Sequence, residues 1–398
     1  MIFITMARIS EISKRGIYTD LMRKFRDEGH RVYIVTPRER SLGGSTALIE
    51  SKGVHILGVR TLNLQKTSIL EKGIGQLLVE SQYINGIKRF LSGVRFDVIL
   101  YSTPPITFSR VIKFLKDKNL NAKTYLLLKD IFPQNAVDLG MMKKNGVKGV
   151  LFKYFKNKEK TLYSLSDQIG CMSPANVDYL LSHNPEISSD RVEVAPNSIE
   201  LVSQGIENKE QIREKYHLPT NCPVFIYGGN LGKPQGIPYL MKCLDANGNR
   251  DDCHFVVVGT GTDLPRLKEW HASKKPRSVT LLDGLPKDEY DQLVRACDVG
   301  LIFLDHRFTI PNYPSRLLSY LENKMPVLCA TDPNTDIGRI AEENGYGYWC
   351  ESNSVEAFTA ILDRMIHSDR ETMGERGFTF LCNNYLVENT YNAIMKHV

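Results

Sequence analysis

The chain has 398 residues, of which 42% are hydrophobic, and a formal net charge of +6 at pH 7. Because single hydrophobic cores stop growing near about 250 to 300 residues, we expect two domains. The mild positive charge suits an anionic ligand, an acidic membrane surface or a nucleic acid, and does not choose among them. The eight cysteines form no C-x-x-C pair and no Cys/His spacing typical of zinc, which argues against a disulfide scaffold or zinc module and favours a reducing cytoplasm.

The beginning of the chain, MIFITMARISEISKRG, has no basic segment ahead of its short apolar run, so we expect no secretory signal. No later apolar stretch approaches the roughly 18 residues that a membrane span requires. We therefore expect a protein that is soluble or peripheral to a membrane.

In the first half of the chain, short apolar runs alternate with longer helical patterns. The helical pattern at 16–26, followed by Gly29 as a stop signal, lies between two such runs. This alternation predicts right-handed crossovers and a parallel sheet with helices on both faces. The predicted strands are 2–6, 31–36, 54–59, 98–101, 124–128, 168–172 and 191–195.

A second series begins after Pro196 and predicts a second domain of the same α/β class. Its predicted strands are 224–227, 254–258, 279–282, 299–303 and 326–329. The polar segment 200–214 suits the connection, and 385–398 is helical. Because open parallel sheets bind ligands at the carboxyl ends of their strands, we expect two Rossmann-like, doubly wound domains that face a cleft.

Two glycine-rich loops follow strands of the second domain. Gly229 and Asn230 lie in YGGNLGKPQGIPYL, where glycines let backbone N–H groups approach a phosphate. Gly259 and Gly261 lie in VVVGTGTDLPRL, just before a helix start. The alternative for each loop is an ordinary turn that needs positive φ, and neither loop has the G-x-G-x-x-G spacing of a dinucleotide fingerprint.

A third loop of this domain, PNYPSRLLSYLENKMPVL, leads into a short amphipathic helix. Ser315 is a natural N-cap, and Arg316 in the first turn can pair with a phosphate near the positive end of the helix dipole. Ser319 and Glu322 would lie on the same face as Ser315 and extend a polar line from the phosphates toward a sugar ring. The alternative is a capped surface helix with a salt-bridging arginine.

In the first domain, LLLKDIFPQNAVDLGM places Asp130 directly behind a run of leucines. A buried carboxylate must be paired or hydrogen-bonded, or its pKa rises, so Asp130 is either a structural anchor or a site residue. We favour the site, with Gln134 and Asn135 beside it. Upstream, YSTPPITF contains Thr103 and predicts a stiff pocket wall at another strand end, or only a turn.

The segment 143–160 holds seven lysines and one glutamate among aromatic and aliphatic residues. Such a basic, helix-like stretch suits an anionic bilayer surface. A helix with its apolar stripe in the core and its lysines in water is an equal alternative. Nucleic acid ranks third, because the rest of the chain lacks basic patches and stacking platforms.

Taken together, these motifs make the chain resemble the family-four retaining glycosyltransferases, which have the GT-B fold. The resemblance covers essentially the whole chain and rests on YGGNLG, VVVGTG, DGLP (283–286), YPSRLLSYLENKMPVL, APNSI (195–199) and MGERGFTFL (373–381). KDIFPQNAVDLG makes it similar, more narrowly, to bacterial surface-polysaccharide enzymes that transfer N-acetylated deoxyamino sugars such as L-fucosamine.

The resemblance implies three parts, which are an acceptor-binding domain at 1–197, a nucleotide-sugar-binding domain at 198–378, and a terminal helix at 379–398 that packs back on the first domain. It also implies a donor held without a metal ion. The implied donor-binding residues are Gly229, Asn230, Gly259, Gly261, Leu285, Ser315, Leu317, Ser319 and Glu322. Asp130, Arg316 and Lys233 are the implied catalytic residues, and Thr103, Gln134 and Asn135 the implied acceptor-binding residues.

The chain departs from the family pattern in two places. Asn230 and Gln235 stand where the donor domain often has an arginine and a lysine, so we expect Arg316 and Lys233 to compensate the diphosphate charge. The family's pair of glutamates falls on Pro311 and Ser319, neither of which is acidic. Glu322, one turn further, is the candidate replacement for the carboxylate that binds ribose.

The implied reaction moves an N-acetylated amino sugar, for example L-FucNAc, from a UDP-sugar to a polyprenyl-diphosphate-linked saccharide, with retention. It would belong to capsule or O-antigen biosynthesis, on the inner face of the plasma membrane and without nucleic acid. Two rivals are a UDP-sugar 2-epimerase, which would need no acceptor, and a non-catalytic nucleotide-sugar-binding scaffold subunit.

Overall fold

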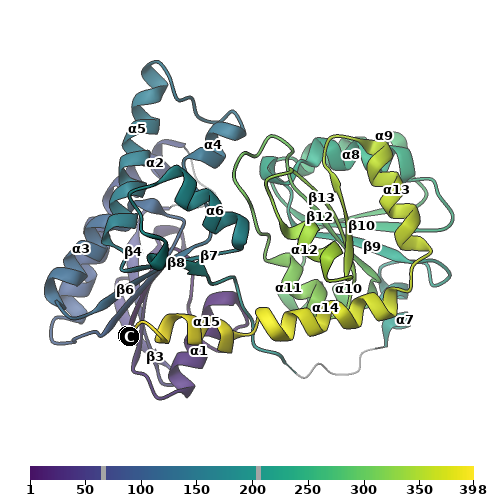
Figure 1. The fold of residues 1–398 in the computed structure, drawn as a ribbon. Helices are drawn as coiled ribbons and strands as arrows, with labels where there is room; N and C mark the ends of the chain where they lie inside the picture. The colour runs from purple at the N-terminus through teal and green to yellow at the C-terminus, as the bar shows by residue number, and fades with distance from the viewer. Residues whose placement is uncertain (64–68, 203–207) are drawn as a thin grey trace. The chain divides into compact units, whose positions relative to one another are not determined.

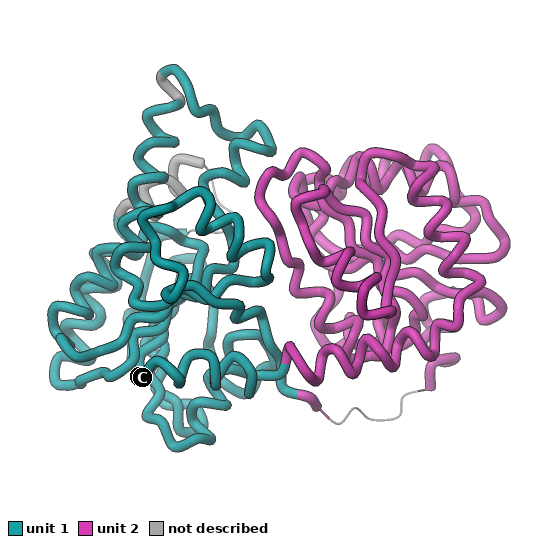
Figure 2. The backbone as a smooth tube through the Cα atoms, viewed as in Figure 1, with its two compact units in different colours: residues 1–200, 386–398 teal, residues 201–385 magenta. Residues whose placement is uncertain are grey.

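The computed structural model describes residues 1–63, 69–202 and 208–398, and divides into two compact units (Figure 2). The first unit comprises Met1–Glu200 with Leu386–Val398, and the second comprises Leu201–Tyr385. Each unit is a β-sheet covered by helices (Figure 1), so the predicted α/β class with two doubly wound sheets is confirmed.

The first unit has an eight-stranded sheet in the order β3-β4-β2-β1-β5-β6-β7-β8. All seven strands predicted for it are present, and every neighbouring pair is parallel except β3 and β4. The strand missed is the edge strand β3, which is half-exposed. The strands are β1 Ile2–Ile4, β2 Val32–Glu39, β3 Ala47–Ser51, β4 Val54–Thr61, β5 Val98–Ser102, β6 Lys123–Leu128, β7 Gln168–Cys171 and β8 Val192–Val194.

The helices of the first unit are α1 Ile17–Asp27, α2 Ile69–Phe90, α3 Ser109–Lys118, α4 Gln134–Asp138, α5 Val147–Leu165, α6 Pro174–His183 and α15 Val387–Met395. The last helix, α15, packs against α1: the rings of Tyr391 and Phe25 lie 4.9 Å apart, and His30 shares a 2.9 Å hydrogen bond with the Tyr391 hydroxyl. The end of the chain therefore belongs to the core of the first unit.

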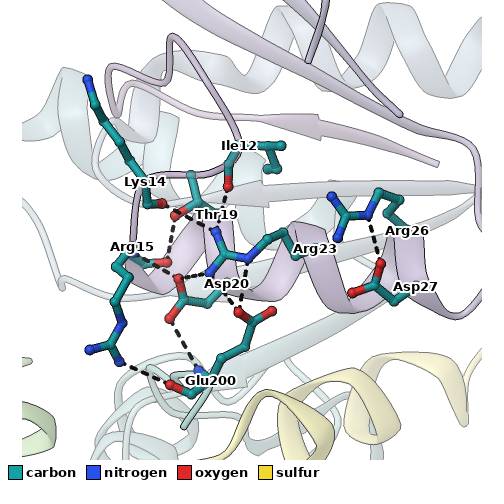
Figure 3. A network of polar contacts seen from close by, with 10 residues as sticks. Ile12, Lys14, Arg15, Thr19, Asp20, Arg23, Arg26, Asp27 and Glu200 are labelled. Atoms are coloured by element: carbon teal, nitrogen blue, oxygen red, sulfur yellow. Dashed lines mark hydrogen bonds and ion pairs between the residues drawn. The ribbon is translucent and has the colours of Figure 1, made fainter. Parts of the chain in front are cut away.

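The point where the chain leaves the first unit is held by a network of ion pairs (Figure 3). Arg23 of α1 lies 2.7 Å from the carboxylate of Asp20 and 2.7 Å from that of Glu200. Asp20, whose side chain is only 1% exposed, also accepts hydrogen bonds from the backbone N–H groups of Gly16 and Glu200. Because a buried carboxylate is stable only when paired in this way, the network fixes Glu200 to α1.

The second unit has a six-stranded sheet in the order β11-β10-β9-β12-β13-β14, parallel throughout. Its predicted strands are all present, and β14 is an addition. The strands are β9 Val224–Asn230, β10 His254–Thr260, β11 Val279–Asp283, β12 Val299–Phe303, β13 Val327–Thr331 and β14 Gly347–Glu351. The helices are α7 Lys209–Lys215, α8 Ile237–Asn247, α9 Leu264–Lys274, α10 Lys287–Ala296, α11 Arg316–Glu322, α12 Ile337–Glu343, α13 Val355–Ile366 and α14 Arg370–Asn384.

The strand order of the second unit reverses between β9 and β12. The chain runs outward from β9 to β10 and β11, and then returns to β12 on the opposite side of β9. Ligands of open parallel sheets bind outside the carboxyl ends of the strands at such a switch point. The glycine-rich loop after β9 and the long segment after β12 meet at this position.

Helix α11, which begins with Arg316, packs closely against α14. A Cβ added at Gly374 of α14 would lie 1.9 Å from the carbonyl oxygen of Lys324, just beyond α11. The glycines of MGERGFTFL therefore serve the close packing of these two helices. Among residues 1–63, 69–202 and 208–398, no helix is long and apolar enough to cross a membrane.

Candidate functional site

The glycine-rich turns after β9 and β10 lie side by side. Gly229 and Gly259 are register partners in the sheet, and a Cβ at Gly259 would lie 1.8 Å from the carbonyl oxygen of Gly229. Gly229 has φ +117°, in the region that side-chain-bearing residues rarely adopt. A Cβ at Gly261 would lie 2.2 Å from the carbonyl oxygen of Leu231. The two turns therefore form one backbone surface that only glycine permits.

Arg316 reaches this surface from the start of α11. A Cβ built at Gly229 would lie 3.7 Å from Nη2 of Arg316. The three loops that the sequence singled out, at Gly229, Gly259 and Arg316, are thus brought together within one unit. This arrangement places the N–H donors of the Arg316 guanidinium beside exposed glycine backbone. Guanidinium groups and backbone N–H groups together are typical of phosphate-binding sites.

The guanidinium of Arg316 lies over the ring of Tyr227, with its central carbon 4.3 Å from the ring centroid. No carboxylate in ranges 1–63, 69–202 or 208–398 forms an ion pair with it. Its Nη1 is buried and has no hydrogen-bond partner among these residues. Burial lowers the pKa of Arg316, and the neighbouring Tyr227 and Tyr320 raise it to a net value above the ordinary one. The group is a permanent, uncompensated cation.

Tyr227 lies against this cation, and Tyr320 and Tyr290 are near enough to act on it electrostatically. We call Tyr227, Tyr290 and Tyr320 the tyrosine cage. Tyr290 of α10 fills the space above Gly228, where a Cβ would lie 2.1 Å from its hydroxyl. The Tyr320 hydroxyl, on α11, donates to the carbonyl oxygen of Ile226 at 3.2 Å and accepts from the N–H of Gly228 at 3.4 Å. Sequence reasoning missed these residues, because each alone is indistinguishable from a core aromatic.

The start of α11 differs from the prediction in two ways. Ser315 is the N-cap residue, but its side chain makes no capping hydrogen bond, because its backbone is already helical with φ −62° and ψ −16°. The helix has only seven residues, so its dipole is a weaker anion-attracting feature than predicted. The charge at this position comes from Arg316.

The other predicted residues of α11 lie further from the glycine turns. Leu317 is 1% exposed and its N–H donates to the carbonyl oxygen of Pro314, so it belongs to the core. Ser319 is half-buried, and its carbonyl oxygen accepts from Asn323. Glu322, at the end of the helix, lies about 9 Å along the axis from Arg316 at 1.5 Å per residue.

The remaining predicted donor residues frame the glycine turns. The Asn230 amide donates to the side-chain oxygen of Gln235 at 2.9 Å, and the Tyr227 hydroxyl donates to the Asn230 carbonyl at 2.9 Å. Lys233, between them in the sequence, is exposed at the start of a short 3-10 turn, Lys233–Gln235. Leu285 follows Gly284, whose Cβ position would contact Thr260. Loops after β9, β10 and β11 are therefore contiguous.

In the first unit, Asp130 lies at the carboxyl end of β6. Its Oδ1 accepts a 2.8 Å hydrogen bond from the amide of Asn135 on α4. Burial raises the pKa of Asp130 to about 6, against the lowering effect of that hydrogen bond. No ion pair to Asp130 occurs within the described ranges. A carboxylate without a cationic partner is the electrostatic pattern of a proton-accepting or hydroxyl-binding group.

The groups around Asp130 hold its loop in place. The hydroxyl of Thr103, which is 1% exposed, accepts from the N–H of Lys129 at 3.0 Å, so Thr103 acts as a support of the loop. The ammonium of Lys129 donates to the carbonyl oxygen of Ala195 at 3.0 Å, and burial lowers its pKa to about 7. Gln134 donates to Asp138 at 2.6 Å. Lys129 was not among the predicted site residues.

The described residues contain no group of three or more His, Cys, Asp or Glu side chains that could hold a metal ion. The cationic side chains near the glycine turns are Arg316 and, on the adjacent loop, Lys233.

Comparison with known proteins shows which families and proteins this chain is similar to. Residues 208–379 match the family model described as Glycosyl transferases group 1. The chain is 24% identical to the probable glycosyltransferase WbjE of Pseudomonas aeruginosa over 329 residues, which cover 80% of this chain and 78% of that protein. It is 22% identical over 244 residues to Escherichia coli K12 WcaI, named as a colanic acid biosynthesis glycosyl transferase, and covers 60% and 59% of the two chains.

Among solved structures, a sucrose-phosphate synthase from Thermosynechococcus elongatus has the same fold. The TM-score is 0.76 at 13% identity, over 99% of this chain and 97% of that chain. Residues 208–379 are thus similar to the group 1 glycosyl transferases, and the chain has the GT-B fold and is a nucleotide-sugar-dependent, retaining glycosyltransferase.

Proposed function

We propose that the chain transfers an N-acetylated amino sugar, such as L-FucNAc, from a UDP-sugar to a polyprenyl-diphosphate-linked saccharide in surface-polysaccharide biosynthesis. The uncompensated cation at Arg316, beside the glycine turns at Gly229 and Gly259, carries the donor half of this proposal. The likeness to WcaI, named for colanic acid biosynthesis, supports the polysaccharide context.

The donor diphosphate would lie on the backbone surface of the glycine turns, with Nη2 of Arg316 on one of its oxygens. Negative charge grows on the leaving diphosphate as the sugar bond breaks. A fixed cation in a water-poor position stabilises that charge more than it stabilises the intact donor, which lowers the barrier. Lys233, on the exposed turn next to Asn230, would add a second and more solvated charge.

The acceptor hydroxyl would bind at Asp130 in the first unit. The carboxylate is held by hydrogen bonds from the Asn135 amide and the Ile131 backbone, and it is ionised above pH of about 6. It would accept the hydrogen bond of the attacking hydroxyl and so orient it, with Asn135 fixing the carboxylate plane. Each unit would thus contribute one substrate site.

The proposed reaction is tested by incubating the purified protein with UDP-N-acetylamino sugars and a lipid-diphosphate saccharide while UDP release is followed. We expect release only when both substrates are present. Conversion of the donor sugar without acceptor would instead indicate a 2-epimerase. Binding of UDP-sugar with no turnover of any donor and acceptor pair would indicate a scaffold subunit.

We also propose that the first unit binds an anionic membrane surface through the start of α5 and the segment before it. Four large apolar side chains are exposed here, namely Met141 at 60%, Val150 at 69%, Leu151 at 52% and Tyr154 at 40%. Lys143, Lys144 and Lys153 are exposed between them, and the ammonium of Lys144 lies 5.7 Å from the ring centroid of Phe152. Basic groups around exposed apolar ones match the interface of an anionic bilayer.

The lysines further along α5 have partners within the protein. Lys156 pairs with Glu159, Lys158 with Glu80, and Lys160 with Glu186. These ion pairs engage the lysines in the later part of the predicted basic stretch. The earlier lysines lie exposed beside apolar side chains, so the first part is better suited to contact lipid. We call Lys143, Lys144 and Lys153, with their apolar neighbours, the basic tip.

Changing Lys143, Lys144 and Lys153 together to glutamine is expected to weaken binding to anionic vesicles about 100-fold, since each basic residue contributes about 1 kcal/mol at such a surface. Co-sedimentation with phosphatidylglycerol vesicles measures the effect. The Lys156→Gln/Lys160→Gln variant serves as the matched control and should bind nearly as wild type. Equal binding of wild type to anionic and zwitterionic vesicles would contradict the basic tip.

A further inference from the structure

A buried guanidinium ordinarily has a carboxylate partner, because an unpaired buried charge costs several kcal/mol. Arg316 is half-buried, with its Nη1 fully buried, and the ring of Tyr227, 4.3 Å from the guanidinium carbon, lies where such a partner would be. An arginine stacked on an aromatic face keeps its full charge, whereas a carboxylate would neutralise it. The surroundings of Arg316 therefore hold the side chain without cancelling its charge.

Each member of the tyrosine cage is itself anchored. Tyr227 is completely buried in β9, and its hydroxyl donates to the carbonyl oxygen of Asn230 at 2.9 Å. The Tyr320 hydroxyl, also fully buried, bridges β9 and β12 through the carbonyl oxygens of Ile226 and Leu301, at 3.2 and 3.4 Å. The cage thus ties Arg316 to the strand that carries the glycine turn and to its neighbour.

Tyr290 closes the cage from α10, outside the sheet. Its hydroxyl is the atom that would contact a Cβ at Gly228, one residue before the glycine that faces Arg316. Burial raises the pKa of Tyr290 to about 12, against the lowering effects of Arg316 and Tyr320. Tyr290 hydrogen-bonds to Tyr320 and is neutral at every physiological pH, so it adds no counter-charge beside Arg316.

We propose that Tyr227, Tyr290 and Tyr320 are positioning residues for the donor: they hold Arg316 toward Gly229 and leave its charge for the diphosphate. This inference rests on the proposed function of the second unit and names the residues that act through Arg316. None of the three needs to touch the donor for the effect. Tyr290, half-buried and on a separate helix, is the member whose hydroxyl is removed with least disturbance of the sheet.

A double-mutant cycle on UDP affinity tests the cage, measured by isothermal titration with the full chain. Tyr290→Phe alone is expected to weaken UDP binding about three- to ten-fold, the range for one neutral hydrogen bond. In an Arg316→Ala background the same change is expected to have less than about a two-fold effect, because residues that act through a shared partner are not additive. Tyr239→Phe, which loses a hydroxyl bonded to the Ser354 carbonyl elsewhere in the unit, is the matched control and should bind UDP as wild type.

Equal losses for Tyr290→Phe in both backgrounds would overturn the cage, since they would show a role independent of Arg316. No loss in the wild-type background would overturn it as well. Thermal unfolding of each variant separates lost folding from lost binding. Absence of UDP binding by the wild type would instead contradict the proposed function, so the two failures are distinguishable.

Discussion

Arg316→Ala is expected to lower kcat/KM for the UDP-sugar donor by about 100- to 1,000-fold, the usual cost of removing one preorganised donor from a developing negative charge. The side chain is the cation that faces Gly229, and the described residues supply no second one at the same distance. Most of the loss should appear in kcat, because charge on the diphosphate is greatest in the transition state. Initial-rate kinetics of UDP release measure both constants.

Two further variants sharpen this result. Arg316→Lys should recover only part of the activity, since an ammonium keeps the charge and lacks the planar fork of donors. Arg364→Ala is the matched control: Arg364 also lies over a tyrosine ring, 4.0 Å from the centroid of Tyr348, but on α13. It should retain wild-type kinetics. An Arg316→Ala enzyme within a few-fold of wild type would show that the diphosphate is bound elsewhere.

Asp130→Asn is expected to lower kcat/KM for the acceptor by about 100-fold or more, the lower range for loss of a positioned acid-base group. The affinity for UDP should not change, because Asp130 belongs to the unit that we assign to the acceptor. The exposed Asp117, whose side chain is 62% exposed and pairs with Lys113, provides the matched control, and Asp117→Asn should leave the acceptor kinetics intact.

The pH profile gives an independent readout of Asp130. Since burial raises its pKa to about 6, the wild-type carboxyl group becomes neutral as the pH falls through 6, and kcat/KM should fall with it. Lys129, whose pKa burial lowers to about 7, also loses a proton as the pH rises, and its positive charge is lost above about pH 7. The acidic limb should be absent from the Asp130→Asn profile. An acidic limb that persists unchanged in that variant would assign the titration to another group.

The fold was largely predictable, because buried parallel strands are continuous apolar runs that stand out against helical patterns. The two strands that were missed show the limit of this signal. β3, Ala47–Ser51, pairs antiparallel at an edge and is half-exposed, and β14, Gly347–Glu351, has the sequence GYWCE with no aliphatic residue. Neither has the apolar run on which the prediction depends.

The grouping of the glycine turns with Arg316 was predicted in part. Gly229, Gly259 and Arg316 could be found because each lies just after a strand or at a helix start, and carboxyl ends of parallel strands meet at one edge. The tyrosine cage could not be found, because residues 227, 290 and 320 come together only through the packing of α10 and α11 on β9. The predicted cap at Ser315 was wrong for a local reason, the helical backbone of that residue.

The division of the basic stretch into an exposed part and a paired part could not be predicted from the sequence. Lys158 and Lys160 are paired by Glu80 and Glu186, which are far from them along the chain. The segment 143–160 itself contains only one glutamate, so its own charges predict a uniformly basic surface. Long-range ion pairs reduce that surface to its first part.

The central claim is that the second unit binds the diphosphate of its donor through Arg316 and the glycine turns, and calorimetric titration of the wild type with UDP and with uridine tests it most directly. Because uridine lacks the diphosphate, UDP should bind at least about 100-fold more tightly, which corresponds to about 2.7 kcal/mol or one to two charge-assisted hydrogen bonds. Equal affinities for UDP and uridine, or no binding of UDP, would contradict the claim.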